Sequence, residues 1–325
     1  MDVSYLLWLQ SLRESTGGVL DSFFLELSHL GLNLLYFLGG VMFWCISKKA
    51  GSCMMFACHF GASFNQLIKN TCCVYRPWIY DARIHPAGDS IRTATGYSFP
   101  SGHTQISFSG YGSLAVSSWN FNRVFAVVLV LFALLIAFSR NYLGVHFGTD
   151  VLVGILEACA LIWFVHWLMT WCERSKNADL WILLGSVLFV ALLFAYVALK
   201  PYPMDYIDGQ LLVDPKKMAM DTYKDSSGFL GFLFGWFIER RWIRLNIAVS
   251  IPWRIVRGIV GCVLIWAIRF HLNLSFIPNS LLNSCLHQFL VLFFMSGIYP
   301  ALLQGIACLG RRPAPKKEAE APAAE

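Results

Sequence analysis

The sequence predicts an all-α fold: a polytopic transmembrane helix bundle, with a six-helix core followed by about three further spans. Hydrophobic residues make up 57% of the chain, charged residues only 14%, and the mean hydropathy is +0.58. Apolar runs at residues 151–171, 180–199 and 281–309 are each long enough to cross a bilayer as a helix. No segment of about ten residues alternates in polarity, so helices rather than a β-barrel must satisfy the backbone in lipid.

The first part of the chain divides into an interfacial segment and the six-helix core. Residues 1–22 mix apolar and charged positions too closely for a span, which indicates a segment lying in the membrane interface. Residues 23–199 form the core. Its spans are predicted at residues 23–46, 51–69, 104–119, 123–139, 149–171 and 180–199. A long polar stretch, residues 70–102, separates the second span from the third.

Residues 200–309 form an accessory transmembrane region of about three helices. Gly228, Gly231 and Gly235 recur at near-helical spacing and predict a close-packing face on a short seventh helix. Residues 239–257 carry five arginines between apolar residues, which predicts a helix in the headgroup region. An eighth span ends near His271 and a ninth near residue 309. Residues 310–325 consist of Gly, Pro, Ala, Glu, Lys and Arg, a composition that predicts a disordered tail.

Basic residues gather on one side of the predicted bundle. Lys48 and Lys49, the five arginines of residues 239–257 and the basic residues near the C-terminus all share that side, which is therefore predicted to be cytoplasmic. The polar stretch of residues 70–102 then lies on the outer face of the cell membrane. Since the net charge of +6 is explained by topology, it does not imply a nucleic-acid partner. The ten cysteines lie mostly in apolar runs and lack metal-ligand spacing.

Three polar clusters lie at the ends of spans on the predicted outer side. Capping of the helices alone does not require so many polar residues there. The clusters are Lys69 with Arg76; Ser101 with Gly102 and His103; and Arg140 with His146 and Asp150. A cation costs about 2.5–3.5 kcal/mol at the centre of a transmembrane helix, so three converging cations call for an anion. A phosphate fits best, because guanidinium groups grip its oxygens bidentately and an ammonium adds a mobile charge.

The second cluster adds to this anion site. Ser101 and Gly102 begin the third span, so a hydroxyl and free backbone amides point outward at a helix N-terminus, which itself attracts anions. Gly102 lets the ligand approach closely. The sequence therefore predicts that Lys69, Arg76, Ser101, Gly102 and Arg140 bind phosphate.

The two histidines provide a reaction for the bound phosphate. His146 and Asp150 are four residues apart and share a face if that segment is helical. The carboxylate can then hold one ring N–H and leave the other nitrogen free to attack phosphorus. His103 can protonate the departing oxygen and later accept a proton from water. No carboxylate cluster that could hold magnesium accompanies them, so neither a metal nor a cofactor is predicted.

The three clusters resemble the tripartite signature of the type 2 phosphatidic acid phosphatase superfamily. That superfamily includes bacterial acid phosphatases, glucose-6-phosphatase and vanadium haloperoxidases. The resemblance implies a six-helix phosphatase core, with His146 as the nucleophile, Asp150 as its partner and His103 as the general acid. It also implies that phosphate, or vanadate in its place, is the ligand of Lys69, Arg76, Ser101, Gly102 and Arg140.

Each cluster, taken alone, also has a purely structural interpretation. Arg140 and Asp150 could form an ordinary ion pair and His103 could be a helix cap, but the joint spacing favours one site. Glu157 lies two turns beyond Asp150 and could belong to a proton path. Core roles are predicted for the remaining polar residues of the spans. These are His59, His166 and His287 as core hydrogen-bonding groups, and Asn65 and Gln66 as interhelical contacts.

The leading prediction is an integral-membrane, metal-independent phosphatase that hydrolyses a lipid phosphate or diphosphate through a phosphohistidine intermediate. A site at span ends, level with the headgroups, receives a lipid's phosphate while the tail stays in hydrocarbon. The candidates are an isoprenoid diphosphate, phosphatidic acid and phosphatidylglycerol phosphate. The alternatives are a phosphatase acting on a soluble organophosphate such as a sugar phosphate, a lipid phosphotransferase and, remotely, a non-catalytic anion-binding membrane protein.

Overall fold

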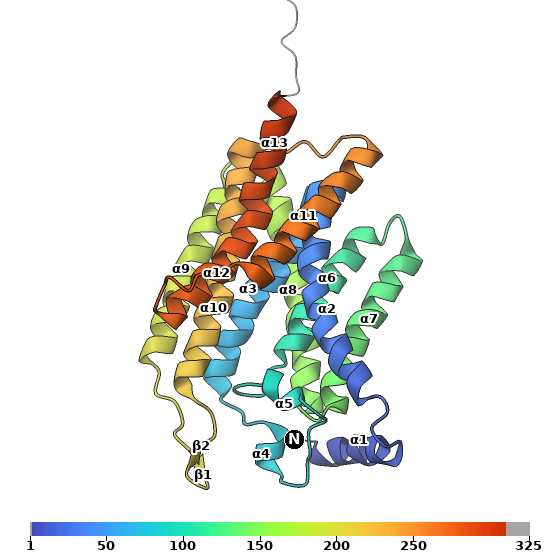
Figure 1. Cartoon of the computed structure of the whole chain (residues 1–325), viewed down its shortest axis with the longest axis vertical. Helices are drawn as coiled ribbons and strands as arrows, with labels where there is room; N and C mark the ends of the chain where they lie inside the picture. The colour runs from blue at the N-terminus through green and yellow to red at the C-terminus, as the bar shows by residue number, and fades with distance from the viewer. Residues whose placement is uncertain (1, 310–325) are drawn as a thin grey trace, which may run out of the picture.

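The protein is a bundle of long helices, described here by a computed structural model that covers residues 2–309 (Figure 1). The predicted tail, residues 310–325, lies outside the described residues. The first half contains α1 (Val3–Ser15), α2 (Asp21–Val41) with the π-turn η1 (Met42–Ile46), α3 (Lys48–Cys72), α4 (Pro77–Tyr80), α5 (Ser90–Thr93), α6 (Gly102–Ser118) and α7 (Arg123–Tyr142). The predicted all-α membrane fold is confirmed.

The second half adds the remaining helices and one small hairpin. It contains α8 (Gly148–Arg174), α9 (Ala178–Leu199), β1 (Tyr206–Ile207), β2 (Gln210–Leu211), α10 (Pro215–Ile238) with η2 (Glu239–Ile243), α11 (Ile251–His271), and α12 (Ser280–Phe293), which continues through η3 (Phe294–Ile298) into α13 (Tyr299–Leu309). The strands β1 and β2 pair antiparallel at the tip of the loop before α10.

Within the described residues, six helical segments are long and apolar enough to cross a membrane. These are Asp21–Ile46, Arg123–Tyr142, Gly148–Arg174, Ala178–Leu199, Ile251–His271 and Ser280–Leu309. The other predicted spans correspond to α3, α6 and α10, which are more polar. Most of α6 is buried between neighbouring helices, and α3 and α10 line an internal cavity. A helix covered by other helices packs through small and polar side chains and does not need an apolar surface for lipid.

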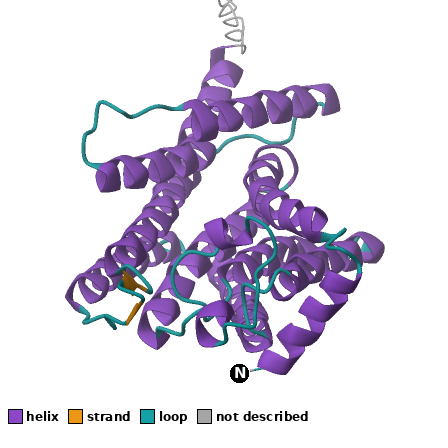
Figure 2. Ribbon diagram, turned by 60° about the horizontal axis from the view of Figure 1, so that its bottom comes forward, coloured by secondary structure: helices purple, strands orange, loops and turns teal. Residues whose placement is uncertain are grey.

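The loops between α3 and α6 close one end of the bundle. In Figure 1 the short helices α4 and α5 lie at the lower end, and α1 lies across that same end. Figure 2 brings this end forward and shows the loops crossing it. Arg13 of α1 donates to the carbonyl oxygen of His85 at 2.6 Å, which ties α1 to these loops.

The predicted glycine face of the seventh helix is confirmed, although α10 begins at Pro215 and, with 24 residues, is longer than the short helix predicted. A Cβ at Gly231 would lie 2.2 Å from the backbone oxygen of Phe289, and one at Gly235 would lie 2.1 Å from the hydroxyl of Ser296. Only glycine permits this approach, so α10 packs directly against α12 and η3.

The headgroup helix predicted for residues 239–257 is wrong. The chain instead continues α10 as the π-turn η2, runs without regular structure over residues 244–250 and enters α11 at Ile251. Three of its five arginines bind the ends of neighbouring helices. Arg241 donates to Asp179 at 2.7 Å, and Arg257 donates to the carbonyl oxygen of Trp44 at 3.0 Å. These contacts hold the segment against the bundle.

Candidate active site

All three predicted clusters lie at the end of the bundle that the loops between α3 and α6 close. Each is positioned by a helix terminus. Lys69 lies in the last turn of α3, and Arg140 in the last turn of α7. Ser101 is the N-cap of α6, and Asp150 lies in the first turn of α8. The ends of four helices therefore bring together residues that are up to 81 positions apart (150 − 69).

His146 and Asp150 are in contact and almost fully buried. The Nδ1 atom of His146 lies 3.3 Å from Oδ2 of Asp150, with side-chain exposures of 2% and 1%. The contact does not arise on a continuous helix, because α8 begins at Gly148. The carboxylate instead turns back over the helix start, where it also accepts from the backbone N–H of Phe147 at 2.9 Å. A carboxylate at Nδ1 favours the tautomer that keeps Nε2 unprotonated.

The other ring nitrogen of His146 faces Arg76. NH1 of Arg76 lies 2.9 Å from Nε2 of His146 and also 2.9 Å from the carbonyl oxygen of Val145. Nε and NH2 of the same guanidinium donate to the carbonyl oxygens of Gly96 and Thr95, each at 3.0 Å. Burial lowers the pKa of Arg76 to about 10, which leaves the side chain charged at neutral pH. Arg76 is therefore a fixed cation beside the nitrogen predicted to attack phosphorus.

The surroundings of His146 keep its ring neutral. Burial holds the pKa of His146 well below its usual value, and the positive charges of Arg76, Lys69 and Arg140 lower it further. The nearby His103 ring acts in the same direction. A neutral imidazole has a free lone pair, which a nucleophile requires.

Lys69 is buried and already has three backbone partners. Its Nζ donates to the carbonyl oxygens of Pro100, Tyr97 and Ser98 at 2.8, 3.1 and 3.5 Å. These contacts hold the segment that leads into α6. The sequence predicted only a phosphate ligand here, so this positioning contact is an addition.

Arg140 is fully buried at 0% exposure, yet most of its donors are unused. NH1 donates to the hydroxyl of Ser28 at 2.6 Å, while Nε and NH2 have no partner among the described residues. Arg140 and Asp150 do not pair among the ion pairs of residues 2–309, so the ordinary ion pair is not the explanation. A buried guanidinium with two open donors is costly alone and suits an anion.

The second cluster forms the start of α6. The backbone N–H of Ser101 donates to the carbonyl oxygen of Asp150 at 3.0 Å, which joins this helix start to that of α8. The hydroxyl of Ser101 accepts from the hydroxyl of Thr104 at 2.9 Å and lies 3.4 Å from its backbone nitrogen, as an N-cap does. Gly102 and His103 follow and line the cavity.

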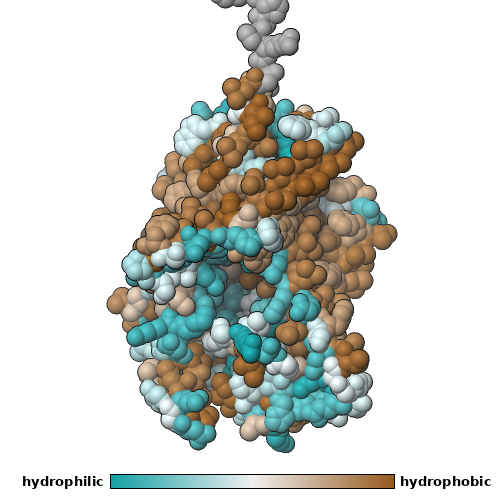
Figure 3. Space-filling model, viewed as in Figure 1, coloured by the Kyte–Doolittle hydropathy of each residue, from teal (hydrophilic) through white to brown (hydrophobic). Residues whose placement is uncertain are grey.

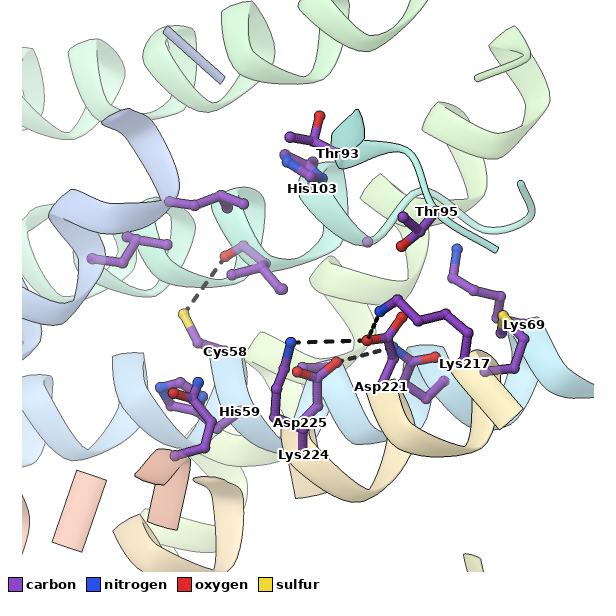
Figure 4. Close-up of a pocket in the computed structure, with 18 of the residues that line it drawn as sticks. Cys58, His59, Lys69, Thr93, Thr95, His103, Lys217, Asp221, Lys224 and Asp225 are labelled. Carbon is purple, nitrogen blue, oxygen red and sulfur yellow. Dashed lines mark hydrogen bonds and ion pairs between the residues drawn. The ribbon is translucent and has the colours of Figure 1, made fainter. Parts of the chain in front are cut away.

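A cavity of about 540 Å³ opens beside this end of the bundle. Five of the eight predicted residues line it: Lys69, Arg76, Gly102, His103 and His146. Ser101, Arg140 and Asp150 do not. Figure 4 shows His103 across the cavity from the charged face of α10, with Lys69 toward one end and His59 toward the other. Figure 3 shows a hollow in the molecular surface that is rimmed by hydrophilic side chains.

Sequence reasoning missed Ser98 and the charged face of α10. The hydroxyl of Ser98 donates to Oδ2 of Asp150 and lies 3.5 Å from Nδ1 of His146. Nothing in the sequence distinguishes it from the other serines of the polar stretch. Facing the site across the cavity, α10 presents two lysines and two aspartates, Lys217, Asp221, Lys224 and Asp225. Their spacing of three and four residues along one helix face was the available signal.

The interhelical contacts predicted for Asn65 and Gln66 are confirmed beside the site. Asn65 donates to Glu157 at 2.8 Å and links α3 to α8, and Gln66 donates to Asp225 at 2.9 Å and links α3 to α10. The other carboxylate oxygen of Glu157 has no partner among the described residues. A proton path through Glu157 stays a prediction.

Comparison with known proteins agrees with this geometry. Residues 50–174, which hold all three clusters, match the PAP2 superfamily. The chain belongs to this superfamily of phosphatases. Residues 223–310 match the transmembrane extension of PAP2 superfamily phosphatases, which here covers most of α10 and all of α11, α12 and α13.

A curated relative supports the same assignment. The chain is 28% identical over 151 residues to phosphatidylglycerophosphatase B of Bacillus subtilis (strain 168), across 43% of this chain and 70% of that protein. No solved structure matches significantly. The chain is thus a multi-pass membrane phosphatase of the PAP2 superfamily, distantly related to phosphatidylglycerophosphatase B.

Proposed function

We propose that this membrane phosphatase hydrolyses a lipid phosphate or diphosphate at the outer leaflet, through a phosphohistidine formed on His146. The observation that carries the proposal is the setting of His146. Its ring lies between Asp150 and Arg76 and borders a cavity that continues between the helices, and burial holds its pKa well below the usual value. A headgroup phosphate can reach such a site from the membrane surface.

In the first step Nε2 of His146 attacks phosphorus as the bond from phosphorus to the leaving oxygen breaks. Protonated His103 gives its proton to that oxygen, and the lipid alcohol or lipid monophosphate departs. Asp150 and Ser98 hold the Nδ1 side of the ring and stabilise the charge it gains. In the second step His103 takes a proton from water, whose oxygen attacks phosphorus, and the phosphorus–nitrogen bond breaks to release inorganic phosphate.

Cationic side chains replace a metal in this mechanism. Arg140 offers two open donors and Arg76 a fixed charge beside Nε2, while Lys69 lies at the same end of the cavity. Such groups neutralise the equatorial oxygens of a transferring phosphoryl group. We therefore propose that turnover needs no divalent ion and that vanadate binds in place of phosphate.

The charge distribution supports an outer active site. Lys48 and Lys49 and the arginines of η2 lie at the end of the bundle opposite the catalytic residues. Basic residues favour the cytoplasmic side, which leaves the site outside. An isoprenoid diphosphate, phosphatidic acid and phosphatidylglycerol phosphate are the candidate substrates, and the name of the Bacillus relative favours the last.

The test is phosphate release by the purified full-length protein in detergent, with lipid phosphates and sugar phosphates compared. We expect release from lipid phosphates, none from His146→Ala, and full activity in the control His166→Ala. His166 lies elsewhere on α8, outside this cavity, and its Nδ1 lies 2.9 Å from the carbonyl oxygen of Ile162. Brief reaction with radiolabelled substrate should label wild type with phosphate that is lost in acid and kept in alkali.

Three other outcomes would contradict the proposal in different ways. Turnover of sugar phosphates alone would indicate a soluble organophosphate as substrate. Transfer of phosphate to an added alcohol, with little free phosphate, would indicate a phosphotransferase. Unchanged activity in His146→Ala would rule out the phosphohistidine.

A further inference from the structure

The cavity has a second polar end, distinct from the phosphate site. Four side chains line it there, and we call them the deep polar cluster: Tyr36 of α2, His59 of α3, Arg269 of α11 and Gln288 of α12. Only His59 falls within the matched phosphatase segment, whereas Arg269 and Gln288 belong to the transmembrane extension. Between the two ends the cavity is lined by apolar side chains, including Leu32, Ala62 and Ile106, and by the charged face of α10 (Figure 4).

Arg269 is the unusual member of this cluster. It lies on a predicted span, where a cation is costly. Its guanidinium lies 3.9 Å from the ring centroid of Tyr36, and NH2 donates to Asn33 at 3.0 Å. Its Nε is buried without a partner among the described residues. No carboxylate of residues 2–309 pairs with it.

The rest of the cluster also presents donors without neutralising the charge. Gln288 donates to the hydroxyl of Tyr36 at 2.9 Å, and His59 packs edge-on against the same ring at a centroid distance of 5.6 Å. The hydrogen bond from Arg269 to Asn33 is sufficient to link α11 to α2, so this link does not explain the unpaired donor of Arg269. An open guanidinium at a cavity wall therefore suits a ligand that accepts hydrogen bonds.

The depth of the cluster restricts that ligand. The phosphate site lies level with Asn65, because a Cβ at Gly102 would lie 3.4 Å from Oδ1 of Asn65. His59 lies six residues further along α3, or about 9 Å at the helical rise. The arginine side chain can cover part of that distance. A lipid with its phosphate at His146 places the carbonyls that join its acyl chains at a comparable depth, whereas an isoprenoid chain has only hydrocarbon there.

A second phosphate is a poorer occupant. The catalytic end gathers three cations for one phosphate, while the deep polar cluster offers a single cation. A neutral carbonyl oxygen needs only a hydrogen-bond donor. On the basis of the proposed lipid phosphatase function, we propose that Arg269, assisted by Gln288, binds an acyl carbonyl of the substrate and so selects acylated lipid phosphates over isoprenoid and alkyl ones.

The experiment compares phosphatidic acid with its dialkyl ether analogue of equal chain length, in the same detergent. The two substrates differ only in the carbonyls. A hydrogen bond to a charged group corresponds to a factor of about 10 or more in kcat/KM, so we expect wild type to prefer the ester by about tenfold. Arg269→Met should remove the preference and Arg269→Lys should keep part of it.

Controls separate binding from folding. Arg254→Met alters the same helix at a position outside this cavity, where Nε contacts the carbonyl oxygen of Val249, and should keep the full preference. If Arg269→Met does not fold, Gln288→Leu should lower the preference in its place. Equal kcat/KM for ester and ether in wild type, or faster turnover of an isoprenoid diphosphate, would overturn this inference and leave the proposed function intact. Failure to hydrolyse any lipid phosphate would overturn both.

Discussion

Ser98 provides the sharpest test of how Asp150 supports His146. Oδ2 of Asp150 is shared by three groups: the Ser98 hydroxyl, Nδ1 of His146 at 3.3 Å and the N–H of Phe147 at 2.9 Å. Ser98→Ala removes one of them and leaves the other two. A hydrogen bond to a charged group contributes about 1.5–3 kcal/mol, equivalent to a factor of about 10 to 150 if lost only in the transition state. We expect the lower end, about a tenfold loss of kcat, because the Phe147 amide still orients the carboxylate.

The assay is phosphate release at saturating substrate, since the loss should appear in kcat rather than KM. Ser107→Ala is the matched control. Ser107 is equally buried, and its hydroxyl donates to the carbonyl oxygen of Thr104 at 3.2 Å within α6. It should keep wild-type kcat. A Ser98→Ala enzyme that turns over as fast as the control, or that loses only substrate affinity, would refute the idea that Ser98 acts through Asp150.

Three further predictions concern protonation, phosphate binding and metals. Because the pKa of His146 is held below its usual value of about 6.5, kcat/KM corrected for substrate titration should not fall as the pH drops from about 8 to 6, and an acid limb centred near 6.5 would contradict this. The same depressed pKa stabilises the fold above about pH 6.5, so the melting temperature should fall as the pH drops below it. Arg140→Lys keeps the positive charge but loses the paired N–H donors of the guanidinium, so its affinity for vanadate, measured by calorimetry, should fall by about tenfold. Arg140→Met should lose more affinity. Equal vanadate affinities in wild type and both variants would show that Arg140 does not bind the anion. EDTA should leave phosphate release unchanged, whereas activity that returns only with a divalent ion would exclude the cationic mechanism.

The helix bundle was predictable from the sequence because apolar runs of sufficient length leave few alternatives in lipid. The start of α10 was not. Its first turns carry Lys217, Asp221 and Lys224, which read as a polar loop. In the structure these side chains face the cavity and pair with one another, with Lys217 and Asp221 joined at 2.5 Å. The sequence shows charged residues four positions apart, but it does not show the cavity that these side chains face.

The grouping of the three clusters was predictable, since their spacing matches a known signature, but their contacts were not. A separation of four residues suggested a helical contact between His146 and Asp150. The contact forms instead through the start of α8, because Asp150 reaches back to the amide of Phe147. Likewise, Lys69 was expected to be open to phosphate and is surrounded by carbonyl oxygens. Sequence identifies charged groups, whereas loop geometry decides what they contact.

The transmembrane extension contributes directly to the cavity, which no local pattern could indicate. Asn70, next to Lys69, donates to Thr222 of α10 at 3.0 Å, and Gln66 donates to Asp225 one turn deeper. These bonds attach α10 to the face of α3 that holds the phosphate site. Without α10, α11 and α12 the cavity would lose the walls formed by Lys217, Arg269 and Gln288 and would open to lipid. For the proposed lipid substrate, we therefore expect selection to change with substitutions in the extension that leave the catalytic histidines untouched.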